Sequence, residues 1–292
     1  NLLSLLARHN HWFELLSHFR LHYALIAGVF AAGLFSLRKP ATAIVMVLVA
    51  LANIAVIYPY LSLQVRDSKP GHLRILAANV LTTNQDYAPF IALVRKHQPD
   101  LVFVQEADQS WLDALGQLEA DYPQITALAR DDNFGIAALS RTPDTRLEVI
   151  TIKPADLPAI AASLIVNGQR LNMLAMHTLP PIGPQRAKAR NQQLQASINY
   201  LSGLPKPHVL LGDFNITPWS PFFKDTLKAG GLRDGRIGYG MNNTWPAGFA
   251  FAGIPIDHFL LSSGAVVTGF SVSENYGSDH RALIVDIAVV KP

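Results

Sequence analysis

Two long apolar stretches near the start of the chain limit what it can fold into. Residues 21–37 and 41–61 contain no Asp, Glu, Lys or Arg, and only Arg38, Lys39 and Pro40 separate them. At about 1.5 Å per helical residue, the second stretch is long enough to cross the hydrocarbon layer of a membrane and the first is just long enough. We interpret residues 21–61 as a helical hairpin that binds a lipid bilayer.

Two other interpretations of these stretches fit less well. A pair of buried core helices would normally show a polar face, which neither stretch has, and Gly28 and Gly33 suit the close packing of helices in lipid. A cleaved signal peptide is not expected, because a second apolar stretch follows at once and no A-x-A site ends the first. The sequence therefore favours a membrane hairpin.

The charges are distributed unevenly between the two parts of the chain. Residues 1–71 hold six Lys or Arg and two Asp or Glu, whereas residues 72–292 hold 18 and 19. The basic excess thus belongs to the apolar part, where it suits anionic lipid headgroups. It gives little support to nucleic-acid binding by the rest of the chain.

Charge also indicates an orientation for the hairpin. Arg38 and Lys39 favour a turn on the cytoplasmic side, although Arg8 and Arg20 near the other end weaken this bias. The absence of cysteine is compatible with an oxidising compartment. We expect an integral protein of a bacterial inner membrane, with the large domain on the periplasmic or extracellular side.

The polar segment 66–72, with Pro70 and Gly71 at its centre, predicts a linker. The expected organisation has four parts: a juxtamembrane segment (1–20), two transmembrane helices (21–61), a linker (62–72) and one folded domain (73–292).

The large domain alternates short apolar strands with helices and loops. We expect strands at 73–79, 101–105, 135–140, 159–166, 170–177, 208–213, 256–262 and 281–289. We expect helices at 86–97, 108–119, 185–202 and 220–229. Several strands are continuously apolar, which indicates burial on both faces, and Asn167-Gly168 is typical of a hairpin turn. The pattern predicts packed mixed sheets of an α/β protein rather than a doubly wound parallel sheet.

Polar residues that can bind metals or move protons recur where these strands begin or end. They are Asn79, Glu106, His177, Asp213, Asn215, Asp257, Asp279 and His280. If these strand ends share one edge, the crowded carboxylates require a cation, and oxygen ligands without cysteine favour Mg²⁺ or Mn²⁺. A hard cation among acids and histidines suits the hydrolysis of phosphate esters, with a carboxylate that activates water.

Each of these residues alone also has a structural interpretation. Glu106 could cap the helix that follows it, and Asn79 and Asn215 could be turn residues bonded to the backbone. His177 could be a structural histidine, and Asp257 could accept backbone N–H groups. His280 is open to the same interpretation as His177. Their recurrence at strand ends favours a shared site.

The motifs that contain these residues are "AANV", "VQEAD", "MHTLPP", "LLGDFNITP", "IDHFLLS" and "SDHRALIV". In this order they resemble the endonuclease/exonuclease/phosphatase superfamily, the DNase I-like proteins, over about residues 73–289. The resemblance implies a four-layer α/β/β/α sandwich with the active site at one edge of two packed sheets. With the hairpin in front, the chain resembles membrane-tethered bacterial members.

The resemblance also implies a metal site. Glu106 would be the principal Mg²⁺ ligand, with Asn79 and Asp279 beside it. One branch, the abasic-site endonucleases, has an acid where this chain has Leu81 and a tyrosine where it has His177. A repair nuclease of that branch is therefore not expected, and the site suits one metal ion better than two.

The remaining roles follow from the same resemblance. Asp213 would orient or deprotonate the attacking water, and Asn215 would hold a phosphate oxygen. His280, oriented by Asp257, would bind or protonate the phosphoryl group. His177 would be a second phosphate contact or a general acid.

The substrate stays open at this point, because one fold and site serve many phosphate esters. We expect a membrane-anchored phosphodiesterase that acts on a lipid headgroup or a nucleic acid. Arg186 and Arg190 form a basic patch after His177 that could bind substrate or could be a solvated helix face. A membrane-tethered nuclease that acts outside the cytoplasm and a non-catalytic binding module are the alternatives.

Overall fold

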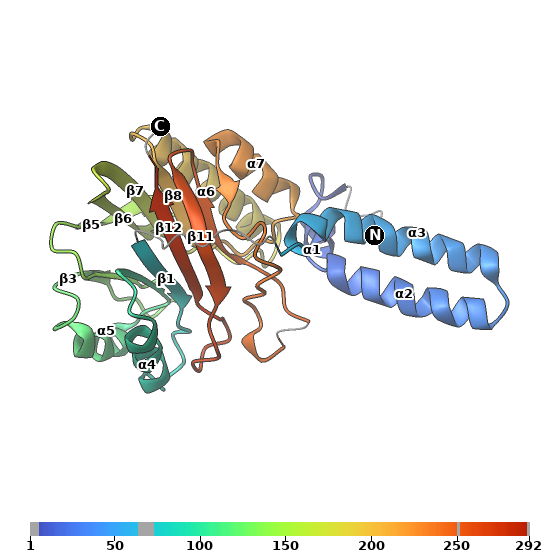
Figure 1. The fold of residues 1–292 in the computed structure, drawn as a ribbon, viewed down its shortest axis with the longest axis horizontal. Coiled ribbons are helices and arrows are strands. Elements are labelled where there is room, and N and C mark those ends of the chain that lie inside the picture. Colours follow the sequence, from blue (N-terminus) through green and yellow to red (C-terminus); the bar gives the residue numbers. More distant parts are fainter. Residues whose placement is uncertain (1–5, 64–72, 250–251, 291–292) are drawn as a thin grey trace.

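The computed structural model describes residues 6–63, 73–249 and 252–290 (Figure 1). Residues 64–72, which are most of the predicted linker, lie outside the described residues.

Two six-stranded sheets form the centre of the large domain (Figure 1). The first has the order β11-β12-β1-β2-β4-β3 and the second β5-β6-β7-β8-β10-β9. The strands of the first sheet are β1 (Leu73–Asn79), β2 (Leu101–Gln105), β3 (Gln124–Leu128), β4 (Ile136–Ser140), β11 (Ala265–Val272) and β12 (Leu283–Val289). Those of the second are β5 (Arg146–Ile152), β6 (Leu157–Val166), β7 (Gln169–Met176), β8 (His208–Asp213), β9 (Arg233–Asp234) and β10 (Asp257–Leu261).

Three apolar layers hold the sheets and helices together. The central layer lies between the two sheets, where side chains such as Phe103 and Phe259 are buried. The second layer packs the first sheet against α4 (Ala88–His97) and α5 (Gln109–Leu115), with the short 3₁₀ turn η3 (Gly116–Leu118) after them. The third packs the second sheet against α6 (Pro184–Ser202) and α7 (Pro221–Gly230). The predicted four-layer α/β/β/α sandwich is confirmed.

The sequence of β2 shows why these strands are continuously apolar. All five of its residues are buried. Because successive side chains point to opposite faces of a strand, Phe103 enters the layer between the sheets while Val102 and Val104 face α4 and α5. A strand covered on both faces has no position for a polar residue until it ends.

The N-terminal part forms the expected helical hairpin, which projects away from the sandwich (Figure 1). It consists of α2 (Arg20–Ser36) and α3 (Pro40–Ile57), preceded by α1 (His11–Ser17) and followed by η2 (Tyr58–Tyr60). One segment, Pro40–Tyr60, is long and apolar enough to cross a membrane by itself. Helices α1 and α2 reach that length only as a pair bent by 67°.

Small residues form the contact between the two helices of the hairpin. The buried positions include Ala24, Ala27 and Ala31 in α2 and Ala43 in α3. Gly28 and Gly33 lie outside this contact, because a Cβ added at either would meet nothing within 4 Å. Large apolar side chains point outward instead; they include Leu25, Val29, Phe30, Leu48 and Leu51.

The base of the hairpin packs against the sandwich. Ile57 and Tyr60 form a small buried cluster with Trp219, which follows β8. The indole N–H of Trp219 donates to the carbonyl of His18 at 3.0 Å. The loop that carries the "GDFN" motif is therefore in direct contact with the N-terminal segment.

Candidate active site

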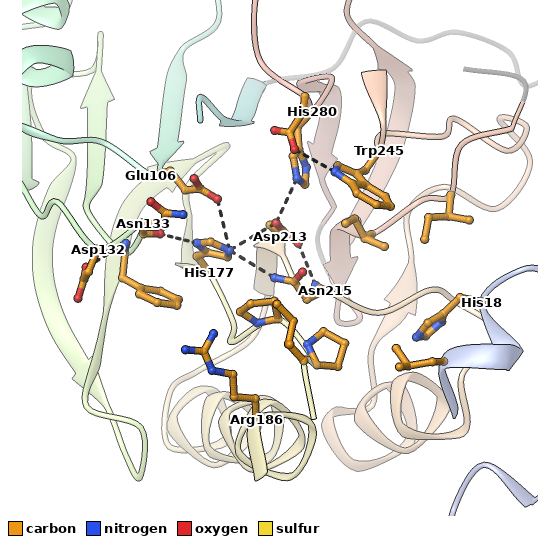
Figure 2. A pocket seen from close by; sticks show the side chains of 18 of the residues that line it. His18, Glu106, Asp132, Asn133, His177, Arg186, Asp213, Asn215, Trp245 and His280 are labelled. Carbon is orange, nitrogen blue, oxygen red and sulfur yellow. Dashed lines mark hydrogen bonds and ion pairs between the residues drawn. The ribbon is translucent and has the colours of Figure 1, made fainter. Parts of the chain in front are cut away.

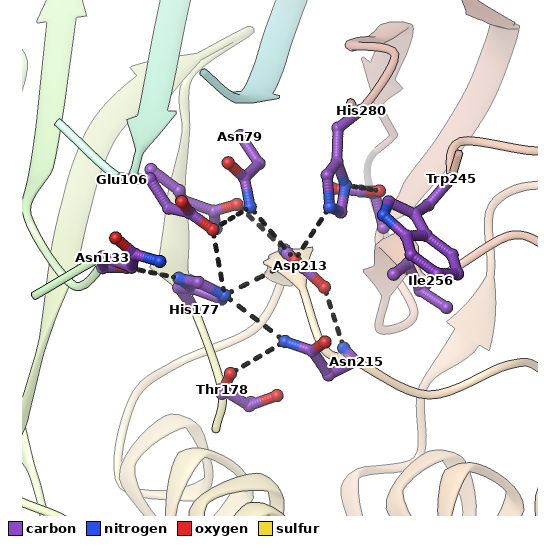
Figure 3. Close-up of polar contacts among 12 residues, drawn as sticks. Asn79, Glu106, Asn133, His177, Thr178, Asp213, Asn215, Trp245, Ile256 and His280 are labelled. Atoms are coloured by element: carbon purple, nitrogen blue, oxygen red, sulfur yellow. Dashed lines mark hydrogen bonds and ion pairs between the residues drawn. The ribbon is translucent and has the colours of Figure 1, made fainter. Parts of the chain in front are cut away.

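A cavity of about 750 Å³ lies at the edge of the sandwich where the strands with polar ends meet (Figure 2). Six of the eight polar residues predicted at strand ends line it: Glu106, His177, Asp213, Asn215, Asp279 and His280. Asn79 and Asp257 touch these residues from behind. The structure thus brings the strand ends of both sheets to one place, as Figure 3 shows.

Glu106 follows β2 and enters the cavity from the first sheet. Its φ of 63° lies in the left-handed region, which is unfavourable for this residue, and strained backbone of this kind is enriched at functional sites. Its carboxylate accepts a hydrogen bond from Asn79 Nδ2 at 2.7 Å, and its backbone carbonyl accepts one from the Thr82 hydroxyl at 3.0 Å. These contacts fix a nearly buried carboxylate at the cavity wall.

Gln105, a residue that our sequence analysis missed, joins the two sheets next to this carboxylate. Its side-chain amide donates to the carbonyl of Met176 at 2.7 Å and accepts the N–H of Asp213 at 3.0 Å. A Cβ at Gly212 would lie 2.1 Å from Gln105 Nε2 and 2.2 Å from the Met176 carbonyl oxygen. The glycine of "GDFN" is therefore required by this close approach.

Asp213, Asp257 and His280 form a buried charged group. Asp213 ends β8 and lies opposite Asp257 in the antiparallel pair of β8 with β10. Two carboxylates facing each other would repel, but the imidazole of His280 lies between them. Its Nδ1–H donates to Asp257 at 2.9 Å, and its Nε2 is 3.6 Å from Asp213 Oδ2.

The pKa values of this group differ strongly from the usual ones. Burial alone would lower the pKa of His280, but the carboxylates of Asp257 and Asp213 outweigh it and raise the pKa to about 10. Burial raises the pKa of Asp213 to about 6, against the opposing effect of His280. Burial would also raise the pKa of Asp257, but its contact with His280 holds it below its usual value. The group at neutral pH is an imidazolium between two carboxylates.

His177 follows β7 and reaches the same centre from the second sheet. Its Nδ1 is 3.0 Å from the carbonyl of Asn133, which can only accept, so Nδ1 carries a proton and Nε2 faces the cavity. Nε2 lies 3.5 Å from Asp213 Oδ2 and 3.9 Å from Glu106 Oε1. Asn215 donates to Nε2 at 3.3 Å and to the Thr178 carbonyl at 2.9 Å.

The donor set fits a hard divalent cation. Four acids line the cavity, namely Glu106, Asp132, Asp213 and Asp279, whereas Arg186 is the one Lys or Arg among the described residues that do so. Such an excess of carboxylates favours a bound cation, and oxygen donors favour Mg²⁺ or Mn²⁺. One ligand atom from each of Asp213, Asp257 and His280 lies within 4.8 Å of the others. Because the His280 imidazolium bonds Asp257 and offsets one of the two carboxylate charges of this trio, Glu106 and Asp279, which have no such cationic hydrogen-bond partner among the described residues, are the acids with more to gain from a metal ion.

Asn79 and Asp279, the other two predicted metal ligands, make different contacts next to Glu106 and Asp213. Asn79 presents its amide nitrogen to Glu106 and, at 3.2 Å, to Asp213, while its Oδ1 accepts the N–H of Leu81. In this arrangement it holds the acids together as a donor. Asp279 is exposed in the cavity and accepts the indole N–H of Trp245 at 3.0 Å. Their roles as metal ligands stay predictions.

The sequence model of the Endonuclease/Exonuclease/phosphatase family matches residues 76–280, which carry this whole arrangement. The chain belongs to this family. It is therefore a metal-dependent phosphoric ester hydrolase, as expected from the motifs.

Solved structures agree with this family fold. D. rerio TDP2 complexed with a single-strand DNA product superposes with a TM-score of 0.63 at 16% identity, over 74% of this chain and 99% of that one. The human Nocturnin catalytic domain with bound sulfate superposes with a TM-score of 0.60 at 20% identity, over 75% of this chain and 94% of that one. Sphingomyelinase C from Streptomyces griseocarneus superposes with a TM-score of 0.57 at 19% identity, over 75% of this chain and 99% of that one. No curated protein matches the chain by sequence. At these identities the likeness concerns the fold alone.

Of the two arginines predicted to bind substrate, Arg186 and Arg190, one faces the cavity and the other does not. Arg186 lines the cavity. Arg190, one turn further along α6, is fully buried and does not line it. Its guanidinium donates to both carboxylate oxygens of Glu14 at 2.7 Å and to the carbonyl of Asn215 at 2.8 Å. Arg190 therefore stabilises the loop that follows Asp213 instead of facing a substrate.

The N-terminal segment contributes residues that sequence analysis did not assign to the site. Leu15, His18 and Phe19 line the cavity together with residues of the family domain. Figure 2 shows His18 on the side of the cavity opposite Glu106 and His177. Only the folded structure reveals this, because these residues precede the matched region by more than fifty positions.

Proposed function

We propose that this chain is a membrane-anchored, Mg²⁺-dependent phosphodiesterase. The observation that carries the proposal is the convergence of Glu106, Asp213 and His280, from both sheets, on one cavity whose lining is rich in acids. Mn²⁺ would be an alternative to Mg²⁺, because both prefer oxygen ligands.

Glu106 would hold the metal ion, with Asn79 and Asp279 beside it. When bound, the ion would neutralise charge on the phosphate and on the group that develops negative charge in the transition state. This use of a cation agrees with the excess of carboxylates around the cavity.

The side chains around the cavity suit the proton transfers of hydrolysis. Asp213, with a pKa of about 6, is ionised at neutral pH and would orient the attacking water and accept its proton. His280, protonated at neutral pH, would donate through Nε2–H to a phosphoryl oxygen, while Asp257 fixes its orientation through Nδ1. Asn215 would hold a phosphate oxygen, and His177 would be a second phosphate contact or, when also protonated at Nε2, the general acid for the leaving group.

The metal requirement has a direct test. The full chain in detergent should hydrolyse bis(4-nitrophenyl) phosphate with Mg²⁺, and EDTA should lower the rate by at least about a hundredfold, in line with the several kcal/mol that a bound cation supplies. Excess Mg²⁺ or Mn²⁺ should restore it. Undiminished turnover in EDTA would contradict the metal assignment, and no turnover under any condition would favour a non-catalytic module.

We further propose that residues 21–61 anchor the enzyme in the membrane, with residues 1–20 as a segment at its surface, 62–72 as a linker and 73–292 as the catalytic domain. The outward-facing apolar side chains of the hairpin support this, since Val29 is 74% exposed and Leu48 is 59% exposed in the isolated chain. Arg38 and Lys39 in the turn between α2 and α3 support a cytoplasmic turn. The catalytic domain would then face the periplasm of a bacterial cell or the exterior.

Protease accessibility tests this orientation. In spheroplasts of bacteria that express the full chain, added protease should degrade the catalytic domain without lysis. A cytoplasmic marker protein in the same sample should stay intact. If the domain survives until the cells are lysed, the proposed orientation is wrong.

A further inference from the structure

The cavity is lined by both polar and apolar residues. Glu106, His177, Asp213 and His280 form a polar side. Apolar residues also line the cavity, and we call five of them its apolar side: Leu15, Phe19, Trp245, Ile254 and Ile256. Figure 2 shows His18 and Trp245 facing the hollow across from Glu106 and His177. This lining suits a substrate that carries an apolar part next to its phosphate.

The apolar side is built partly by the N-terminal segment, and that segment is held firmly. Besides the bond from Trp219 to the His18 carbonyl, His18 Nδ1 lies 2.8 Å from the Thr217 hydroxyl. Burial lowers the pKa of His18 to about 4, so this ring adds no charge to the wall at neutral pH. His22 of α2 also contacts the large domain, at the carbonyl of Ala252, 2.7 Å away.

The charge of the cavity does not suit a polymer with many phosphates. Arg186 is the one Lys or Arg among its described lining residues. Proteins that grip nucleic acids usually neutralise several phosphates with Lys and Arg. One phosphate and one apolar group match the cavity better than a strand of DNA or RNA.

The position of the apolar side identifies the source of such a substrate. Phe19 lines the cavity, and α2 begins at the next residue, Arg20. If the hairpin lies in a membrane, the apolar side of the cavity begins where the membrane begins. Ile182, which also lines the cavity, is 73% exposed and adds apolar surface at its opening.

We propose that the substrate is a membrane lipid with a phosphodiester headgroup, whose tail lies against Leu15, Phe19, Trp245 and Ile254 while its phosphate reaches Glu106 and Asp213. This proposal rests on the proposed function and names its substrate class. The N-terminal segment then has two tasks, because it anchors the enzyme and supplies part of the site that selects a lipid.

Tail length is the variable that tests this proposal. We would measure kcat/KM of the full chain, with Mg²⁺, for alkyl 4-nitrophenyl phosphate diesters with methyl, butyl and octyl groups. Each methylene that enters the apolar side should raise kcat/KM by up to about fourfold, so we expect at least about a tenfold rise across the series. The Kd of the matching alkyl phosphates, measured by calorimetry below their micelle concentrations, should fall in parallel.

Substitutions show whether the dependence on tail length comes from the cavity wall or from a general preference of the protein for detergent-like molecules. The double variant Leu15→Gln/Phe19→Gln should lose most of the dependence on tail length in both measurements. Ile165→Gln is the matched control, because Ile165 is 57% exposed on β6 and does not line the cavity. It should keep the dependence of the wild type.

The outcomes distinguish this inference from the proposed function. Turnover that is independent of tail length in the wild type, or equal dependence in the double variant, would overturn the inference while the phosphodiesterase proposal stands. Binding that strengthens with tail length, without turnover of any diester, would support the apolar subsite and overturn the proposed function. A higher kcat/KM for a DNA oligonucleotide than for the octyl diester would overturn the inference in favour of a nuclease.

Discussion

Replacing Glu14 by alanine is expected to lower the free energy of unfolding of the full chain by about 3–5 kcal/mol. The Glu14 carboxylate is 1% exposed and accepts hydrogen bonds from Arg190 at 2.7 Å and from the Ser220 hydroxyl at 2.9 Å. Its removal would leave the guanidinium of Arg190 buried without a counter-ion. Because Arg190 also donates to the carbonyl of Asn215, the loop after Asp213 should lose order and activity should fall as well.

This effect is measured as the melting temperature of the full chain. For a chain of this size, the expected loss corresponds to a decrease of roughly 6–20 °C. The double variant Glu14→Leu/Arg190→Met should recover much of the stability, since a buried ion pair can often be replaced by apolar residues of similar volume.

Arg8→Ala is the matched control for Glu14→Ala. Arg8 also links the N-terminal segment to the large domain, through Asp225, but its side chain is 53% exposed. An exposed pair contributes less than about 1 kcal/mol, so this variant should melt close to the wild type. Equal melting temperatures for Glu14→Ala and Arg8→Ala would refute the structural role of the buried pair.

The strands that could be predicted from the sequence share a physical property. The eight expected strands correspond to β1, β2, β4, β6, β7, β8, β10 and β12, which are the inner strands of the two sheets. Those missed are the outer strands β3, β5, β9 and β11. An outer strand is less completely covered, and β3, for example, has no buried residue. Its sequence therefore lacks the continuous apolar run on which the prediction depended.

The site residues also divide into those that a local sequence pattern reveals and those that it does not. Glu106, His177 and Asp213 were found because each interrupts an apolar strand at its end. Gln105 lies at a strand end too, but its role depends on Met176 and Asp213 in the other sheet, which no local pattern reveals.

The Glu14–Arg190 pair could not be predicted for a related reason. Its members are 176 positions apart, and Glu14 lies in a segment that composition assigns to the membrane part. The basic patch that contains Arg190 suggested a phosphate contact. Only the packing of α1 against α6 and the loop after β8 shows that a carboxylate of this chain occupies that position.

Asp213→Asn should reduce kcat by roughly 10²–10⁴-fold, the usual contribution of a positioned base. The amide keeps the shape of the carboxylate and can still accept the N–H of Asn215, which bonds Asp213 Oδ1 at 2.9 Å. It cannot accept a proton from water. Since Asp213 is buried and its pKa is raised by burial, removing its charge should cost little stability, and the melting temperature should stay near that of the wild type.

Asp132→Asn provides the control for this substitution. Asp132 lines the same cavity, but its carboxylate is half exposed and pairs with Arg130. Removing its charge changes the electrostatic potential of the cavity without removing the proposed base. This variant should keep most of its activity.

The most direct measurement is the initial rate of Mg²⁺-dependent hydrolysis of bis(4-nitrophenyl) phosphate by the wild type, Asp213→Asn and Asp132→Asn, with melting temperatures recorded for all three. If strand ends from both sheets form one hydrolytic centre, only Asp213→Asn loses its activity, and it does so while still folded. A folded Asp213→Asn enzyme that works as fast as the wild type would contradict the account.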